Sequence, residues 1–143
     1  HARMLAQQKL ISPEEAEAVD GKAIETLMSS PLGGRMRAAE KLNREFRFSV
    51  LLPAEDFFHG GGEDELLLQG AVDCWFEEAD GVVIVDYKTD SVTAEETAGR
   101  AEFYAPQLRA YALAVTAVTG KPVKEAFLYF LRPGKAVKME KKL

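Results

Sequence analysis

The chain has 143 residues, of which 47% are hydrophobic and 29% are charged. This size and balance are typical of one globular domain and exclude a largely disordered chain. No apolar run reaches the length of a membrane span, and residues 1–8 lack the pattern of a signal peptide. The single cysteine, Cys74, excludes an internal disulfide and a thiolate zinc or iron–sulfur site. We therefore expect a cytoplasmic protein without a membrane partner.

The net charge is −5, from 18 basic and 23 acidic residues. Affinity for DNA comes largely from Lys and Arg side chains that neutralise phosphates. A chain with this balance is therefore expected to hold DNA weakly by itself, although it can act on DNA that another module delivers. Because the first residue is not Met, we also expect a fragment of a longer protein.

The first segments are predicted to be helical. Ser12-Pro13-Glu14-Glu15 has the form of a helix start, in which the serine caps the helix and the last glutamate closes a capping box. The helix is predicted to continue to about Met28 and to be broken by Pro31-Leu32-Gly33-Gly34. A second helix is expected at about Arg35–Leu42.

Strands are predicted next. Hydrophobic and polar residues alternate over residues 45–52, which is the period of a sheet with one face in the core. Residues 53–65 contain three consecutive glycines and are predicted to form a mobile loop. Two further strands are expected at Glu65–Glu78 and Val82–Lys88, joined by a hairpin turn at Asp80-Gly81.

The remaining elements predict the fold class. Thr93-Ala94-Glu95-Glu96 is a capping box that opens a short helix, and a long helix is expected at Glu102–Thr119, ended by Gly120. A strand at Val123–Leu131 and a short one at Ala136–Met139 follow. The long helix can serve as a crossover between parallel strands, so we expect an α/β fold with a mixed central sheet flanked by helices.

Two charged residues end the hydrophobic strand at 82–88. Asp86 and Lys88 are two apart and share one face, whereas Val83 and Val85 point to the other face and into the core. A charged side chain in a buried strand is costly unless it is paired or bound to metal. The pair therefore indicates a functional site.

Asp73, on the neighbouring strand, is predicted to lie beside this pair. A two-residue turn at Asp80-Gly81 sets Asp73 opposite Lys88, and a four-residue loop at Glu78–Gly81 sets it opposite Asp86. Either register places all three on one face, within cross-strand contact. Two carboxylates this close repel each other unless a cation or proton lies between them, and oxygen ligands suit Mg²⁺ or Mn²⁺. A structural ion pair is the alternative interpretation for any one of them alone.

These residues resemble a known family. Asp73 followed by Asp86-Tyr87-Lys88 resembles the D…(D/E)-x-K core of the restriction-endonuclease-like nucleases, the PD-(D/E)XK superfamily. More narrowly, QGAVDCWFEEADGVVIVDYKTD (69–90) and YAPQLRAYALAV (104–115) resemble the C-terminal nuclease domain of the bacterial AddA helicase–nuclease, a relative of RecB. The resemblance extends over residues 12–130 and implies a restriction-endonuclease-like fold.

The resemblance also implies roles for individual residues. Mg²⁺, or Mn²⁺ in its place, would bind Asp73, Asp86 and the main-chain carbonyl of Tyr87, with Glu45 joining directly or through water. Lys88 would position or deprotonate the attacking water.

A helical motif completes the predicted site. Gln107 and Tyr111 match the Gln-x-x-x-Tyr motif of the family, share one helix face, and are implied to contact DNA or to order the metal-bound assembly. Tyr104 also matches a family position, where packing is the expected role. The upstream metal-binding histidine of the family has no counterpart, because His1 lies too close to residues 12–15. Its absence predicts weaker metal binding by the isolated domain.

The implied function is exonucleolytic hydrolysis of DNA in an ATP-dependent helicase–nuclease of double-strand break repair and recombination. Its partners would be single-stranded DNA from unwound duplex, the helicase domain of the same chain and an AddB-type subunit. The single nuclease domain, residues 1–143, would divide into an N-terminal helical part, 1–42, and a catalytic α/β core, 43–143. The alternatives are a DNA-binding module without turnover and a stand-alone RecB-like nuclease.

Overall fold

The computed structural model describes residues 21–56 and 60–139. The predicted helix start at residues 12–15, and His1, lie outside the described residues. The helices and strands, in chain order, are α3 (Gly21–Ser29), α4 (Pro31–Ala38), β1 (Leu42–Pro53), β2 (Glu65–Glu78), β3 (Gly81–Lys88), α5 (Thr97–Thr119), β4 (Val123–Phe130) and β5 (Lys135–Lys138). Short 3-10 turns at Ala54–Asp56 and Ala94–Glu96 follow β1 and precede α5.

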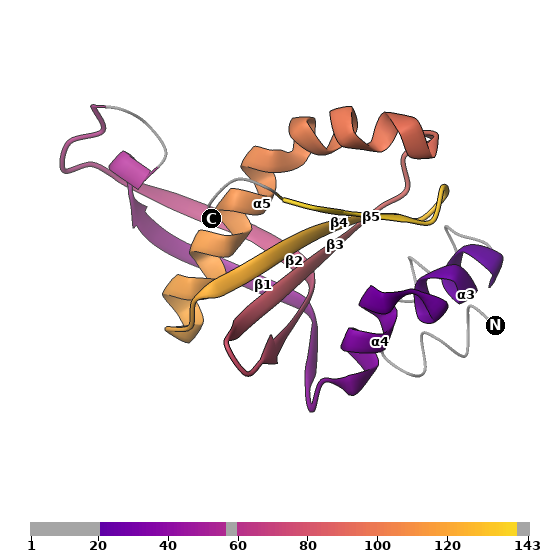
Figure 1. Ribbon diagram of the computed structural model, residues 1–143. Helices are drawn as coiled ribbons and strands as arrows, with labels where there is room; N and C mark the ends of the chain where they lie inside the picture. Colours follow the sequence, from indigo (N-terminus) through magenta and orange to yellow (C-terminus); the bar gives the residue numbers. More distant parts are fainter. Residues whose placement is uncertain (1–20, 57–59, 140–143) are drawn as a thin grey trace.

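The five strands form one mixed sheet in the order β1-β2-β3-β4-β5 (Figure 1). All neighbouring strands are antiparallel except β3 and β4, which are parallel and are connected by α5. The predicted mixed α/β fold with a helical crossover is therefore confirmed. None of the helices described here is both long and apolar enough to span a membrane.

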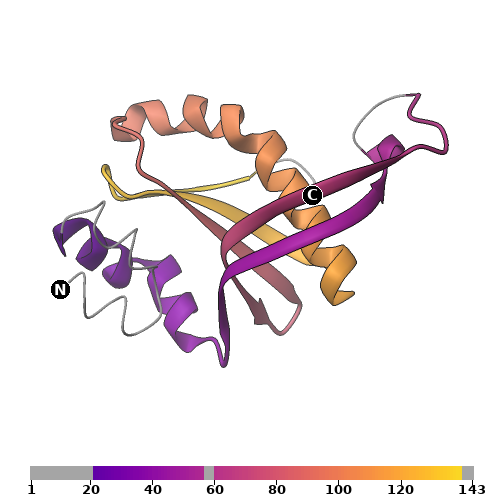
Figure 2. The same cartoon turned by 180° about the vertical axis from the view of Figure 1, so that it is seen from behind.

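Helices cover both faces of the sheet (Figures 1 and 2). Helices α3 and α4 pack on one face, and α5 packs on the other, so that β3 is buried on both sides. The first core contains Ile24, Leu27, Met36, Cys74, Val83, Val85 and Phe127, and the second contains Phe48, Ile84, Leu108, Val115 and Leu128. The face that carries Asp86 is thus a second core under α5, where the sequence pattern indicated only one.

The helix predicted at Arg35–Leu42 begins earlier. Helix α4 starts at Pro31, and Ser30 caps it by accepting a hydrogen bond from the Gly33 N–H at 3.1 Å. A Cβ on Gly33 would lie 2.0 Å from the carbonyl oxygen of Leu27, so this glycine permits close contact between α3 and α4 rather than breaking a helix. Leu42, predicted to be helical, already belongs to β1.

The β2–β3 turn lies one residue earlier than predicted. Glu78 pairs with Gly81, so that Ala79 and Asp80 form the turn and Gly81 begins β3. A Cβ on Gly81 would lie 3.1 Å from the carbonyl oxygen of Pro122, a close approach that only a distant part of the chain imposes.

Helix α5 is longer than the pattern predicted and is bent. The capping box at Thr93 is present, but it opens a 3-10 turn, and the α-helix begins at Thr97. Pro106 lies inside the helix, which changes direction along its length (Figures 1 and 2). Proline lacks the N–H for a helical hydrogen bond and crowds the preceding turn, which explains the bend. Gly120, at φ 73°, ends the helix as predicted.

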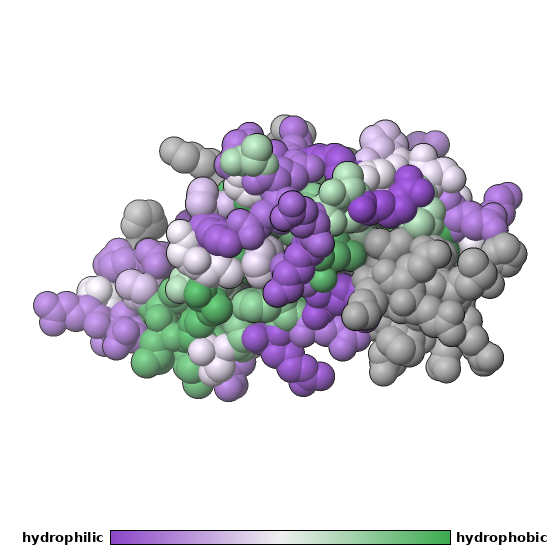
Figure 3. Space-filling view, turned by 90° about the horizontal axis from the view of Figure 1, so that it is seen from below, coloured by the Kyte–Doolittle hydropathy of each residue, from purple (hydrophilic) through white to green (hydrophobic). Residues whose placement is uncertain are grey.

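The β1–β2 hairpin extends beyond the helices that cover the sheet. Leu51 and Leu67 are cross-strand partners on this hairpin and are 61% and 60% exposed. Seen from below, hydrophobic side chains gather toward the end of the molecule where the hairpin projects (Figure 3). This part of the sheet is therefore covered on the α5 side only.

Candidate active site

The pairing of β2 with β3 decides between the two predicted registers. Cys74 lies opposite Val85, and continuing this register by one residue places Asp73 opposite Asp86. The Asp73 carboxylate also accepts a hydrogen bond from the backbone N–H of Tyr87 at 2.9 Å. The two aspartates therefore lie side by side on adjacent strands, next to the point where β3 ends.

Asp86 is buried and faces Lys88. Its residue is 3% exposed, and its Oδ2 lies 2.8 Å from Nζ of Lys88, whose side chain is 15% exposed. Despite this distance, the angles do not form a hydrogen bond, and no donor among the described residues satisfies Oδ2. We treat the contact as an ion pair, because charge attraction does not require aligned lone pairs. A buried carboxylate oxygen without a hydrogen bond is suited to receive a further cation.

Helix α5 supplies the other partners of Lys88. Gln107 Oε1 accepts a hydrogen bond from Lys88 Nζ at 2.8 Å, and the same Nζ lies 4.0 Å from the centroid of the Tyr104 ring. Gln107 and Tyr104 are three apart on one helix face, which the crossover lays against the sheet. Lys88 thus contacts its own strand on one side and α5 on the other.

Tyr111 faces both aspartates from the same helix. Burial raises the pKa of Tyr111 to about 12, and the charges of Asp86 and Asp73 contribute to the rise. Its ring packs edge-on against Phe48 at 5.9 Å between centroids. A Cβ on Gly70 would lie 3.0 Å from the Phe48 ring and 3.6 Å from the Tyr111 ring, so the small residue makes room for both.

The convergence of these side chains agrees with a comparison to protein families. The family model described as PD-(D/E)XK nuclease superfamily matches residues 2–143. The chain belongs to this nuclease superfamily. The mixed sheet flanked by helices, with Asp73, Asp86 and Lys88 at its centre, is its nuclease fold.

Several curated relatives, each named as one of the subunits of an ATP-dependent helicase/nuclease, match almost the whole chain. The one from Acetivibrio thermocellus is 41% identical over 137 residues, and the one from Alkaliphilus metalliredigens is 42% identical over 138 residues. These alignments cover 92% and 94% of this chain but only 11% and 12% of the relatives. A third, from Alkaliphilus oremlandii, is 38% identical with the same coverage as the second. The chain therefore spans about a tenth of these relatives' length.

The donor set of this nuclease domain fits an open divalent metal site. Asp73 and Asp86 supply two neighbouring carboxylates, one of which has the unsatisfied buried oxygen. Within residues 21–56 and 60–139, no group of three or more His, Cys, Asp or Glu side chains is arranged to hold an ion. Mg²⁺ commonly binds through one or two carboxylates and completes its shell with water and phosphate oxygens. Two carboxylates are therefore sufficient for a site that also receives substrate.

Glu45 is placed differently from the other predicted residues. The β1–β2 register sets it across from Asp73, but the ladder passes over it, from Arg44–Cys74 to Phe46–Val72. Glu45 has φ 51°, which is rare outside glycine, and its side chain is exposed. The structure brings it next to Asp73 along the sheet without bringing it into a ligand group.

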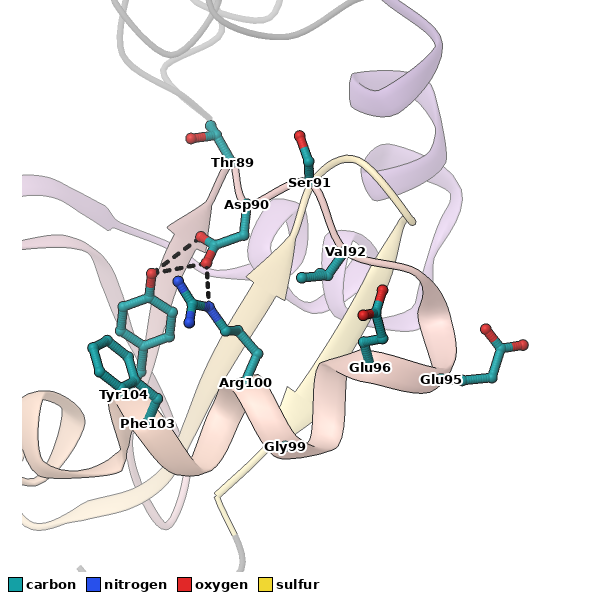
Figure 4. A pocket seen from close by; sticks show the side chains of 10 residues that line it. All are labelled: Thr89, Asp90, Ser91, Val92, Glu95, Glu96, Gly99, Arg100, Phe103 and Tyr104. Atoms are coloured by element: carbon teal, nitrogen blue, oxygen red, sulfur yellow. Dashed lines mark hydrogen bonds and ion pairs between the residues drawn. The ribbon is translucent and has the colours of Figure 1, made fainter.

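Asp90 and Arg100 were not singled out from the sequence. Asp90 accepts hydrogen bonds from the Tyr104 hydroxyl at 2.9 Å and from Arg100 Nε at 2.7 Å. All three line a cleft of about 910 Å³ between the end of β3 and the start of α5 (Figure 4). Burial raises the pKa of Asp90, but the hydrogen bonds from Arg100 and Tyr104 outweigh it and lower the pKa overall. The available signal was the four-residue spacing of Arg100 and Tyr104.

Proposed function

We propose that this chain is a metal-dependent nuclease domain that hydrolyses DNA phosphodiester bonds as an exonuclease. The supporting observation is the convergence of Asp73, Asp86 and Lys88 on one face of the sheet in a member of a nuclease superfamily. The names of the relatives support a place in an ATP-dependent helicase–nuclease. We further propose that this enzyme acts in double-strand break repair and recombination, in the cytoplasm.

Mg²⁺ is the proposed cofactor, and Mn²⁺ can replace it. Asp73, Asp86 and the main-chain carbonyl of Tyr87 would hold it, with Glu45 assisting through water. When bound, the ion acidifies a water molecule and stabilises negative charge on the phosphate.

The side chains around this position have separate tasks. Lys88 Nζ donates to the attacking water or to a phosphate oxygen, and Gln107 Oε1 holds that ammonium from α5. Tyr111, with a pKa of about 12, keeps its hydroxyl proton at neutral pH and donates it toward the phosphate. The burial of Asp86 keeps bulk water away from its carboxylate. Each contact is in place before DNA arrives, which is the preorganisation that such a reaction requires.

The substrate we propose is single-stranded DNA released from unwound duplex. A net charge of −5 supports delivery by another module rather than strong binding by this domain. The helicase domain of the same chain would deliver the strand, and an AddB-type subunit would be the second partner.

The decisive test is Asp86→Asn in the full-length protein, assayed with end-labelled single-stranded DNA and Mg²⁺. We expect cleavage to fall by at least about 10³-fold, because the carboxylate charge is lost while the side-chain size is kept. Glu77→Gln is the matched control, since Glu77 lies on β2 and pairs with Lys121 far from the site. Cleavage by Asp86→Asn at the wild-type rate would refute the proposal. A wild-type protein that binds DNA but does not cleave it with Mg²⁺ or Mn²⁺ would instead identify a binding module.

A further inference from the structure

Tyr104 contacts the proposed catalytic lysine through its ring and a separate polar cluster through its hydroxyl. We propose that Tyr104 is a positioning residue, which Asp90 and Arg100 fix in place so that its ring holds the Lys88 ammonium when Asp86 binds a cation. This inference rests on the proposed function, because it assigns Lys88 a task in cleavage.

The contact between Lys88 and the ring is short. Nζ lies 4.0 Å from the ring centroid, well inside the distance at which an ammonium is attracted by the negative face of an aromatic ring. The Lys88 side chain is largely buried, so water competes weakly for the ammonium. The ring is therefore a third partner of Lys88, beside Asp86 and Gln107.

The third partner becomes important when a divalent cation approaches. Asp86 is the carboxylate expected to bind that cation, so its attraction for Lys88 weakens at that moment. The cation also repels the ammonium, and the four-carbon stem of lysine allows Nζ to move away. Gln107 and the Tyr104 ring are the remaining contacts, and both lie on α5. They keep the ammonium near the reacting phosphate.

The ring itself is held by its hydroxyl group. The Tyr104 hydroxyl lies 2.9 and 3.1 Å from the two carboxylate oxygens of Asp90, and Arg100 pairs with the same carboxylate at 2.7 Å. Figure 4 shows both groups directed at Asp90. Burial raises the pKa of Tyr104, and the hydrogen bond to Asp90 raises it further, so the phenol remains a donor. Asp90 thereby restricts rotation of the ring away from Lys88.

The position of Lys88 is read by NMR of the full-length protein labelled with ¹³C at lysine Cε. A ring 4.0 Å from Nζ shifts the ε-methylene signal upfield, and Lys88→Met identifies that signal by its loss. We expect the upfield shift to persist when Mg²⁺ is added to the wild type and to Tyr104→Phe. It should be absent in Tyr104→Leu. In Asp90→Ala it should decrease on addition of Mg²⁺, because the ring is no longer anchored.

Single-turnover cleavage measures the consequence. Tyr104→Leu should lower the rate at saturating DNA about tenfold with little change in KM, whereas Tyr104→Phe should stay within about threefold. Asp90→Ala should slow the wild type but add nothing in the Tyr104→Leu background, since both changes act through one contact. Phe103→Leu is the control, because this exposed neighbour packs against Arg100 and Tyr104 rather than against Lys88.

The results separate this inference from the proposed function. Tyr104→Leu with an unchanged lysine signal, or an equal loss in Phe103→Leu, overturns the positioning role. If Lys88→Met cleaves normally, the proposed role of Lys88 in cleavage fails, and the lysine signal still shows whether Tyr104 holds Lys88.

Discussion

Asp73 is joined to Tyr87 by a hydrogen bond of 2.9 Å from the backbone N–H of Tyr87 to its carboxylate. The bond crosses from β2 to β3 just beyond the last ladder pair, Cys74–Val85. Asp73 therefore has a structural task, fastening the strand ends, in addition to the metal binding proposed for it. The two tasks make different demands on the side chain and can be separated.

Replacing Asp73 by Asn and by Ala separates them. Asn keeps an acceptor for the Tyr87 N–H but loses the charge, so we expect cleavage to fall at least about 100-fold with stability nearly unchanged. Ala removes the acceptor as well, which leaves a part-buried N–H unsatisfied and costs about 1–2 kcal/mol. Urea unfolding gives the stability, and the end-labelled DNA assay gives the rate. Equal stability of the two variants would show that the hydrogen bond contributes nothing.

Tyr111→Phe tests the hydroxyl group without disturbing the packing. The edge-on contact with Phe48 requires only the ring, so the thermal midpoint should change little. Cleavage should slow about tenfold, because one donor toward the phosphate is lost. Since the pKa of Tyr111 is about 12, the pH–rate profiles of both proteins should have the same shape between pH 6 and about 10. A profile whose alkaline limb disappears in the variant would contradict this assignment.

Glu45 combines a strained backbone with a proposed assisting role. At φ 51°, glycine is favoured over any other residue, so Glu45→Gly should stabilise the domain by about 1 kcal/mol. Both Glu45→Gly and Glu45→Gln should slow cleavage, because each removes the carboxylate. Glu45→Gln retains the strain and should leave stability unchanged. If neither variant alters the rate at limiting Mg²⁺, Glu45 takes no part in metal binding.

Glu78 ties helix α4 to the sheet and makes stability depend on pH. The hydrogen bond from Arg35, followed by that from Lys124, lowers the pKa of Glu78 from 4.5 to about 2. A carboxyl group with a lowered pKa in the folded state contributes stability that is present above pH 4.5 and is lost as the pH falls through about 2. Because the pair is partly exposed, we expect about 1 kcal/mol. Glu78→Gln should abolish this part of the loss between pH 5 and pH 2, measured by urea unfolding at each pH.

The strands and the shared face of the site were predictable because both depend on local patterns. Alternating and continuous hydrophobic runs predicted β2 with its observed ends, and the two-residue spacing of Asp86 and Lys88 predicted their common face. The choice between two registers was not predictable. It depends on the position of the turn, which contacts Pro122 and Lys124 from a distant segment, and no local pattern records that contact.

Side-chain partners contributed by α5 were predictable only in part. The spacing of Gln107 and Tyr111 indicated one helix face, and that face does meet Lys88 and the aspartates. The contact of Tyr104 with Lys88, and its anchoring by Asp90, depend on how far the crossover carries the helix along the sheet. Similarly, the positive φ of Glu45 interrupts a strand whose sequence alternates without a break.

Pro106 lies between Tyr104 and Gln107, the two helical residues that contact Lys88. The bend at this proline therefore sets the angle between a ring and an amide that grip the same ammonium. An alanine there would regain the helical hydrogen bond to the carbonyl of Glu102 and improve helix propensity by about 3 kcal/mol. The straighter helix would also draw the two side chains apart. At this one position, a firmer fold and a well-aimed lysine require opposite residues.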